Sequence, residues 1–243
     1  MAAGPHRPCR RGLVAVGDSI TRGAGQPMLG VDCRSWALWL AEALELPYTN
    51  LARDGAAVSD MLDEQTVRLR GPYELGCLYG GVNDVRAADF DVEAYERTLT
   101  LLARRLEREC DHVVLVAIPP DLGRPRAAGS VMQANAAIRR VARSVGATAV
   151  STEGLTGWRL VMPDAVHLTA LGQVHLADRA AGSLALDGLT AFRSPLAQAV
   201  ATEDWSGSLR YAVTGWAPAA ARDLRRRVRE RTLIESLRAG RGG

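Results

Sequence analysis

Short apolar runs alternate with longer segments of helical periodicity along most of this chain. A strand buried on both faces of a parallel sheet is apolar along its whole length, whereas a surface helix is apolar at every third or fourth residue. Five runs fit the first description: Leu13–Gly17, Tyr48–Leu51, Leu75–Tyr79, Val113–Ile118 and Ala147–Ser151. The alternation predicts an α/β fold, with a parallel sheet covered by helices on both faces.

Helical periodicity fills the segments between and after these strands. The predicted helices are Ser35–Leu46, Ser59–Leu69, Asp91–Arg108, Ser130–Val145 and a fifth that follows the N-cap residue Thr169 and runs to about Leu184. Pro47 ends the first helix and Gly146 ends the fourth, as expected for residues that stop helices.

The loops at the carboxyl ends of the strands are where an open parallel sheet binds its ligands. In this chain they are Asp18–Ser35, Ala52–Val58, Gly80–Phe90, Pro119–Gly129 and Thr152–Leu168. The stretches that carry candidate chemistry all fall in these loops. This agreement favours a functional site at that edge of the sheet.

The first of these stretches follows the strand Leu13–Gly17 directly. Gly17 permits a sharp turn that points Ser19 out of the sheet edge, where a serine can act as a nucleophile. Gly-Asp-Ser also occurs in ordinary turns, where Asp and Ser bond their own backbone. The serine therefore needs support from the rest of the chain.

That support comes from Asp164 and His167, which precede the predicted helix at Thr169. A serine nucleophile needs a base to take its proton and a group to orient that base. With two residues between them, the carboxylate can receive the Nδ1–H of the imidazole while Nε2 faces Ser19. His6, His112 and His175 have no such acid nearby in the sequence.

Two further loops offer donors for an oxyanion. Gly55 follows the second strand and can bring its backbone N–H close to a substrate oxygen. Asn83 follows the third strand and offers a side-chain amide. Glycine and asparagine are common in turns, so it is their order and placement together that indicate a site.

The chain resembles the SGNH/GDSL hydrolase family in four blocks that occur in the family's order. They are Gly17-Asp18-Ser19-Ile20-Thr21, Gly55, Gly81-Val82-Asn83-Asp84 and Asp164-Ala165-Val166-His167, and the resemblance covers about residues 11 to 186. It implies a three-layer α/β/α sandwich with a five-stranded parallel sheet, flavodoxin-like in topology. It also implies that Ser19 is the nucleophile, His167 the base and Asp164 its orienting acid, with an oxyanion hole formed by the Ser19 N–H, the Gly55 N–H and the Asn83 amide.

Three charged residues within or next to these blocks are predicted to bind substrate: Asp18, Arg22 and Asp84. Arg22 departs from the family pattern, because many intracellular relatives carry an acidic residue at this position. A cation there either favours an anionic substrate or pairs with Asp32. The departure leaves the substrate class open and does not affect the chemistry.

We expect two parts in the chain: a hydrolase domain over residues 11–190, and a C-terminal extension over residues 191–243 that packs on the domain or projects from it. Seven arginines lie between Arg222 and Arg238. One interpretation is a basic helix for an anionic surface. The favoured one is a helix with a solvated arginine face that packs on the domain through Leu224, Val228, Leu233 and Ile234.

Composition and the N-terminal residues indicate the class of protein and its cellular compartment. The hydrophobic share is 47%, and no window approaches the ~18 consecutive apolar residues of a membrane span. The first twelve residues lack the apolar core of a secretory signal, which favours the cytoplasm. Four well separated cysteines (Cys9, Cys33, Cys77 and Cys110) indicate neither a disulfide framework nor a structural metal. All 30 basic residues are arginine, and the net charge is +3.

The predicted function is a serine esterase or deacylase that cleaves small or medium acyl esters through an acyl-enzyme on Ser19. No cofactor or metal is expected, and the expected partner is a small-molecule ester rather than nucleic acid or a membrane. One alternative is an acyltransferase or thioesterase that uses the same site in a biosynthetic pathway. Another is a non-catalytic binding module that docks through its basic tail. The sequence leaves the acyl chain, the alcohol and the oligomeric state open.

Overall fold

A sheet of five parallel strands forms the centre of the computed structural model, which describes residues 11–122, 128–199, 205–218, 220–221 and 224–225. The strands are β1 (Leu13–Gly17), β2 (Tyr48–Asn50), β3 (Tyr73–Tyr79), β4 (Cys110–Val116) and β5 (Thr148–Val150). Their order is β2-β1-β3-β4-β5. The chain therefore switches direction across the sheet between β1 and β3, which is where ligands bind in folds of this kind.

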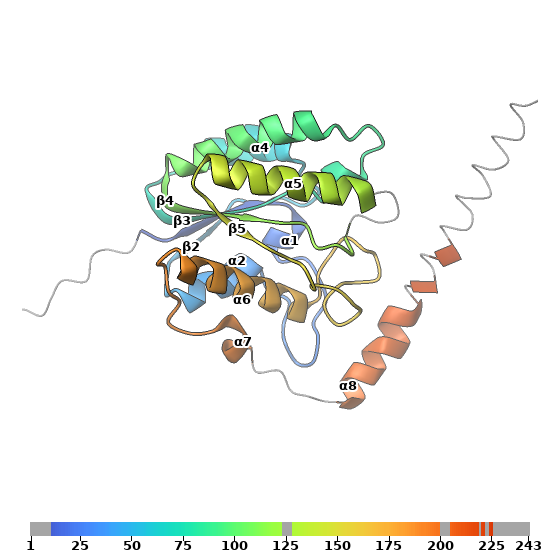
Figure 1. Cartoon of the computed structure of the whole chain (residues 1–243). Coiled ribbons are helices and arrows are strands. Elements are labelled where there is room, and N and C mark those ends of the chain that lie inside the picture. Colours follow the sequence, from blue (N-terminus) through green and yellow to red (C-terminus); the bar gives the residue numbers. More distant parts are fainter. Residues whose placement is uncertain (1–10, 123–127, 200–204, 219, 222–223, 226–243) are drawn as a thin grey trace, which may run out of the picture.

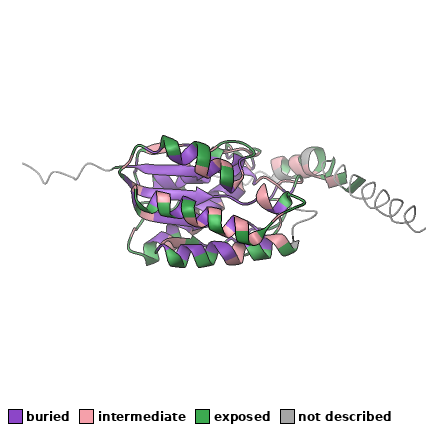
Figure 2. Cartoon of the chain, turned by 90° about the horizontal axis from the view of Figure 1, so that it is seen from above, coloured by how far each residue is buried: buried purple, intermediate pink, exposed green. Residues whose placement is uncertain are grey.

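Helices cover both faces of the sheet (Figure 1). On one face α2 (Trp36–Ala43) contacts α6 (Ala170–Leu186), and on the other α4 (Val92–Glu107) contacts α5 (Ala128–Ser144). Figure 2 shows the buried sheet between these layers, with exposed residues on the outward sides of the helices. The predicted three-layer α/β/α sandwich is thus confirmed.

The position of β1 in the sheet explains why its sequence is apolar throughout. All five of its residues are buried, because strands lie on both sides of it and helices lie above and below. Ala15 pairs with Asn50 of β2 and with Cys77 of β3. The strand is therefore a rigid base for whatever follows Gly17.

The predicted N-cap of the last long helix is confirmed. The Thr169 hydroxyl accepts a hydrogen bond from the Gly172 N–H at 3.2 Å, so α6 begins immediately after the loop that carries His167. Ser35 and Asp91 cap α2 and α4 in the same way.

The segment predicted as one helix over 59–69 differs from that expectation. It consists of α3 (Val58–Asp60), a π-helical turn η1 (Met61–Gln65) and a 3₁₀ turn η2 (Thr66–Arg68). Met61 and Gln65 are the buried residues of η1, although one of them is polar. Wide turns of this kind are frequent at functional sites, and the position of Gln65 gives the reason below.

Beyond the sandwich, α7 (Pro195–Gln198) packs against α2 and α6. The Ser194 hydroxyl donates to an Asp178 carboxylate oxygen at 2.7 Å, and Phe192 N–H donates to the Ala43 carbonyl at 2.9 Å. α8 (Trp205–Arg210) and the π-helical turn η4 (Tyr211–Trp216) follow. The chain thus contacts the sandwich through α7 before it reaches α8 and η4.

Most of the predicted arginine-rich helix lies outside the described residues, as do Val228, Leu233 and Ile234. Leu224 is described, and it is 62% exposed, so its expected burial against the domain is wrong. Among the described helices, none is long and apolar enough to cross a membrane.

Candidate active site

Ser19 stands just after the end of β1, where α1 (Ser19–Arg22) begins. Asp18 is the N-cap residue, and its carboxylate accepts the Ile20 N–H at 2.9 Å. A side chain at position 17 would come within 2.7 Å of the Tyr79 carbonyl oxygen, so the turn requires glycine. Ser19 is 8% exposed. The predicted turn out of the sheet therefore exists, with Ser19 as the first residue of a short helix.

Two buried glutamines hold this turn, and neither was identified from the sequence. Gln65 brackets Gly17: its Oε1 accepts the Gly17 N–H at 2.9 Å, and its Nε2 donates to the Gly17 carbonyl at 2.8 Å. Gln173 donates from Nε2 to the carbonyls of Ile20 and Ala24 at 2.9 and 3.2 Å. Both glutamines are at most 1% exposed. The available signal was a polar residue on an apolar helix face, since Gln65 lies one turn after the buried Met61.

The three side chains proposed as a triad lie in one hydrogen-bonded chain. Ser19 Oγ is 2.9 Å from His167 Nε2, and His167 Nδ1 is 2.8 Å from Asp164 Oδ2. The Nδ1 position therefore carries the proton donated to the carboxylate, which leaves Nε2 as the acceptor for the Ser19 hydroxyl. This is the orientation that the sequence predicted.

A tight turn brings Asp164 and His167 together. Asp164 Oδ1 accepts the N–H groups of Val166 and His167 at 2.9 and 3.0 Å, which closes the turn on its own side chain. Ala165 adopts a left-handed conformation with φ of 56°. Such a conformation is unfavourable for alanine, and it is typical of sites where the surroundings fix the backbone.

The charges at this turn act on each other. The hydrogen bond to Asp164 raises the pKa of His167, against the opposing effect of burial, and the negative charge of Asp164 adds to the rise. Burial tends to raise the pKa of Asp164, but the bonds from His167 and from two backbone N–H groups outweigh it, and the net pKa is lowered. Asp164 is therefore ionised wherever His167 titrates.

The three expected oxyanion donors come from three separate loops. The Ser19 N–H is in the first turn of α1, where helix N–H groups lack intrahelical partners. Gly55 has φ of 73°, a backbone conformation that favours glycine. Nothing lies within 4 Å of the place where a side chain would be, so the space beside this residue is open. Asn83 donates one amide hydrogen to the Ala56 carbonyl at 3.1 Å, and its amide carries a second.

Two of the acidic residues predicted to bind substrate are held by backbone groups. Asp18 is 1% exposed, and burial raises its pKa to about 7. Asp84 accepts the Val58 N–H through both carboxylate oxygens at 3.2 and 3.3 Å, and burial raises its pKa to about 6. Contact of these carboxylates with substrate stays a prediction.

Arg22 has a different partner from the one expected. Its guanidinium donates to Asp54 at 2.8 Å, so the predicted pairing with Asp32 is wrong. The reason is topological: β2 lies beside β1, and the loop after β2 therefore passes next to α1. Both side chains of the pair are more than half exposed. Arg22 faces the loop that carries Gly55.

The remaining histidines were not expected to act as bases. Burial lowers the pKa of His175, and His6 lies outside the described residues. Within the described part of the chain, no group of three or more His, Cys, Asp or Glu side chains could hold a metal ion.

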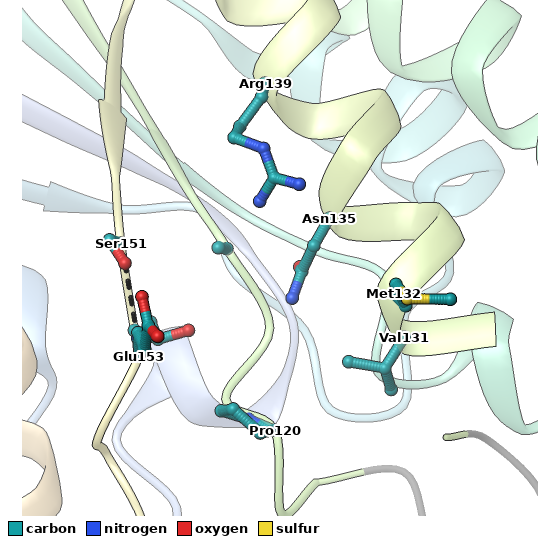
Figure 3. A pocket seen from close by; sticks show the side chains of 9 residues that line it. Pro120, Val131, Met132, Asn135, Arg139, Ser151 and Glu153 are labelled. Atoms are coloured by element: carbon teal, nitrogen blue, oxygen red, sulfur yellow. Dashed lines mark hydrogen bonds between the residues drawn. The ribbon is translucent and has the colours of Figure 1, made fainter. Parts of the chain in front are cut away.

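A hollow of about 440 Å³ lies beyond the carboxyl ends of β4 and β5. Pro120 from the loop after β4, Arg139 from α5 and Glu153 from the loop after β5 are among its lining residues, and Figure 3 shows Arg139 reaching across it from the helix. Ser19, Asp164 and His167 do not line it. The hollow is therefore separate from the hydrogen-bonded chain described above.

Comparison with known proteins gives matches to a family and to solved structures. The model of the GDSL-like lipase/acylhydrolase family matches residues 15–175, whereas no curated protein matches significantly. Acetylxylan esterase Axe2 from Geobacillus stearothermophilus superposes with a TM-score of 0.57 at 18% identity, covering 75% of this chain and 97% of that chain. LAE5, an alpha/beta hydrolase enzyme from the metagenome of Lake Arreo, Spain, gives a TM-score of 0.60 at 20% identity, covering 76% and 97%.

At these identities the solved structures show only that the fold is shared. Membership of the family is shown by the match to the family model. It begins within β1, includes the turn to Ser19, and extends through the loop of His167 into α6. The chain therefore belongs to the GDSL-like lipase/acylhydrolase family, as a serine ester hydrolase of the SGNH type.

Proposed function

We propose that this protein cleaves small or medium acyl esters through a covalent acyl-enzyme on Ser19, with His167 as base and Asp164 as its orienting acid. The observation that carries the proposal is the hydrogen-bonded chain of these side chains, at 2.9 and 2.8 Å. Its members come from two loops far apart in the sequence that meet at one edge of the sheet. Nucleophilic catalysis by serine needs this geometry.

In the first half-reaction, Ser19 Oγ attacks the acyl carbonyl carbon as its proton passes to His167 Nε2. The carbonyl oxygen becomes an oxyanion, which the Ser19 N–H, the Gly55 N–H and the Asn83 amide stabilise. The tetrahedral intermediate collapses when the carbon–oxygen bond to the alcohol breaks. His167 gives its proton to the departing alkoxide, and Asp164 stabilises the imidazolium in between.

In the second half-reaction, water takes the place of the alcohol. His167 accepts a proton from the water, which attacks the acyl carbon, and the same donors hold the second oxyanion. Ser19 leaves with the proton from His167, and the carboxylic acid is released. Each proton transfer in these two half-reactions has a donor and an acceptor among Ser19, His167, the alcohol and water.

The solved relatives support the assignment. Axe2 variants described as catalytic mutants replace a serine, an aspartate and a histidine, and the last two are three positions apart, as Asp164 and His167 are here. Axe2 is an acetylxylan esterase, which supports the small-acyl end of the proposed range. An acyltransferase or thioesterase would use the same three residues, and acceptor assays distinguish these from hydrolysis.

The proposal places the protein in the cytoplasm. Cys33, Cys77 and Cys110 are free thiols, as is usual in a reducing compartment. The proposed partner is a small-molecule ester.

An active-serine phosphonate probe and a series of p-nitrophenyl esters test the function together. We expect covalent labelling at Ser19 and fastest turnover with short acyl chains. Ser19→Ala should abolish labelling and lower kcat by about 10⁵–10⁶, while the exposed Ser59→Ala should match the unchanged protein in both. Esterase activity of a few per cent in purified Ser19→Ala would overturn the proposal.

A further inference from the structure

One tyrosine of the segment that follows the sandwich contacts the loop between β5 and α6, which carries Asp164 and His167. Tyr211 is the first residue of η4, and its ring stacks on Trp158 with centroids 6.3 Å apart and planes at 22°. Tyr211 is partly buried and packs against the hydrophobic core. In Figure 1, α8 lies on the same side of the molecule as the loop between β5 and α6. Trp158 belongs to that loop.

Trp158 is coupled to the triad turn by backbone hydrogen bonds. The residues just after it pair with the residues around His167: Leu160 O accepts the Thr169 N–H at 3.0 Å, and the Met162 N–H donates to His167 O at 2.9 Å. The Thr169 hydroxyl also donates to the Arg159 carbonyl. A displacement of Trp158 is therefore transmitted to the turn that holds the base.

The Tyr211 hydroxyl lies near the triad acid. It is buried and has no hydrogen-bond partner among the described residues. Burial raises the pKa of Tyr211, and the negative charge of Asp164 raises it further.

We propose that Tyr211 is a positioning residue of this enzyme: by stacking on Trp158, it holds the turn that carries Asp164 and His167. The C-terminal extension is then part of the active site. This inference rests on the proposed triad and goes beyond it, since Tyr211 lies outside the segment that the family model matches.

The test uses the full chain with substitutions in η4 and α8. Tyr211→Ala removes the stack, whereas Tyr211→Phe keeps the ring and loses only the unpartnered hydroxyl. Leu209→Ala is the matched control, because it shortens an exposed side chain two residues away. We expect Tyr211→Ala to lower kcat roughly ten- to hundredfold with KM changed less than about threefold. The other two variants should stay within about twofold of the unchanged protein.

The pH profile separates positioning from a general loss of stability. Asp164 raises the pKa of His167, and Asp18 and Asp54, which also face His167, are unchanged in these variants. A loosened turn weakens the bond from His167 to Asp164, so the midpoint at which kcat/KM rises should move to lower pH in Tyr211→Ala only. This midpoint does not depend on how much of the protein is folded. If Tyr211→Ala fails to fold, Tyr211→Leu takes its place with the same expectations.

Three results are decisive. Equal kcat and equal pH midpoints in the Tyr211 variant and in Leu209→Ala, with Ser19→Ala inactive, would overturn the inference and leave the proposed function standing. Activity in Ser19→Ala would instead remove the proposed function itself. A lowered midpoint together with lowered kcat, restored in Tyr211→Phe, supports the positioning role.

Discussion

The two halves of the catalytic chain are held in different ways. Ser19 follows a fully buried strand, and the buried side chains of Gln65 and Gln173 bond the backbone on both sides of it. His167 lies in a partly exposed turn that is closed by its own Asp164, and Tyr211 stacks on Trp158 in the loop that leads to this turn. The nucleophile is thus positioned by the core, and the base by local contacts at the surface.

This difference indicates where the site can adjust. Serine attack demands a fixed nucleophile, because a misplacement of about 1 Å can cost a factor of 10² in rate. The base must change its charge and transfer a proton in both half-reactions, and a turn outside the core accommodates that change at lower cost. Variants on the two sides should therefore fail differently: those near Ser19 in stability, and those near His167 in rate and pH dependence.

The prediction with the largest expected effect on rate tests the turn that holds the base, His167. Asp164→Asn removes the charge that raises the pKa of His167, and an amide can also favour the wrong imidazole tautomer. We expect kcat to fall by about 10³–10⁴, with the melting temperature little changed, because the turn is exposed. Steady-state kinetics and thermal denaturation measure the two effects.

The exposed Asp63→Asn is the control for Asp164→Asn. A large loss of stability in Asp164→Asn would show that this turn belongs to the folding core, and the contrast between the two halves would fail.

The second prediction tests the buried contacts that position the nucleophile, Ser19. Gln65→Leu leaves the buried Gly17 N–H without the side-chain oxygen that accepts from it, while the Gly17 carbonyl keeps the Arg53 N–H at 3.2 Å. A buried donor left unpaired costs about 1–3 kcal/mol, so the free energy of unfolding should fall by that amount. Denaturant unfolding measures it. Gln133→Leu, on the exposed side of α5, should cost much less, and equal losses would mean that Gln65 does not support the turn.

The triad and the sheet were predictable because each depends on local patterns. β1 is a continuous apolar run, and Asp164 and His167 share one turn, so neighbouring residues carry the information. Gln65 and Gln173 were missed because their partners lie 48 and 153 residues away, and a glutamine on an apolar helix face does not say which backbone group it bonds.

The partner of Arg22 was assigned wrongly for a related reason. Asp32 is close in the sequence, but the order of the strands brings Asp54 next to α1. Local pattern predicts which residues take part. The arrangement of the sheet determines which of them meet.

The last prediction concerns the free-energy cost of burying a charged carboxylate beside the nucleophile. Burial raises the pKa of Asp18 from 3.8 to about 7, so the folded protein keeps a proton that the unfolded chain releases between those values. Stability rises with pH only where the unfolded state binds more protons; here the folded state binds more, and stability should fall between about pH 4 and pH 7. Asp84, raised to about 6, acts in the same direction. One pKa unit corresponds to about 1.4 kcal/mol, so the shift of Asp18 corresponds to a fall of about 4 kcal/mol across this range, which denaturant unfolding measures. Asp18→Asn, which cannot ionise, should flatten the fall, whereas the surface variant Asp63→Asn should leave it intact. A stability that rises steadily from pH 4 to pH 7 in the unchanged protein would mean that Asp18 is ionised at little cost, and that the nucleophile side is as well solvated as the turn that holds the base.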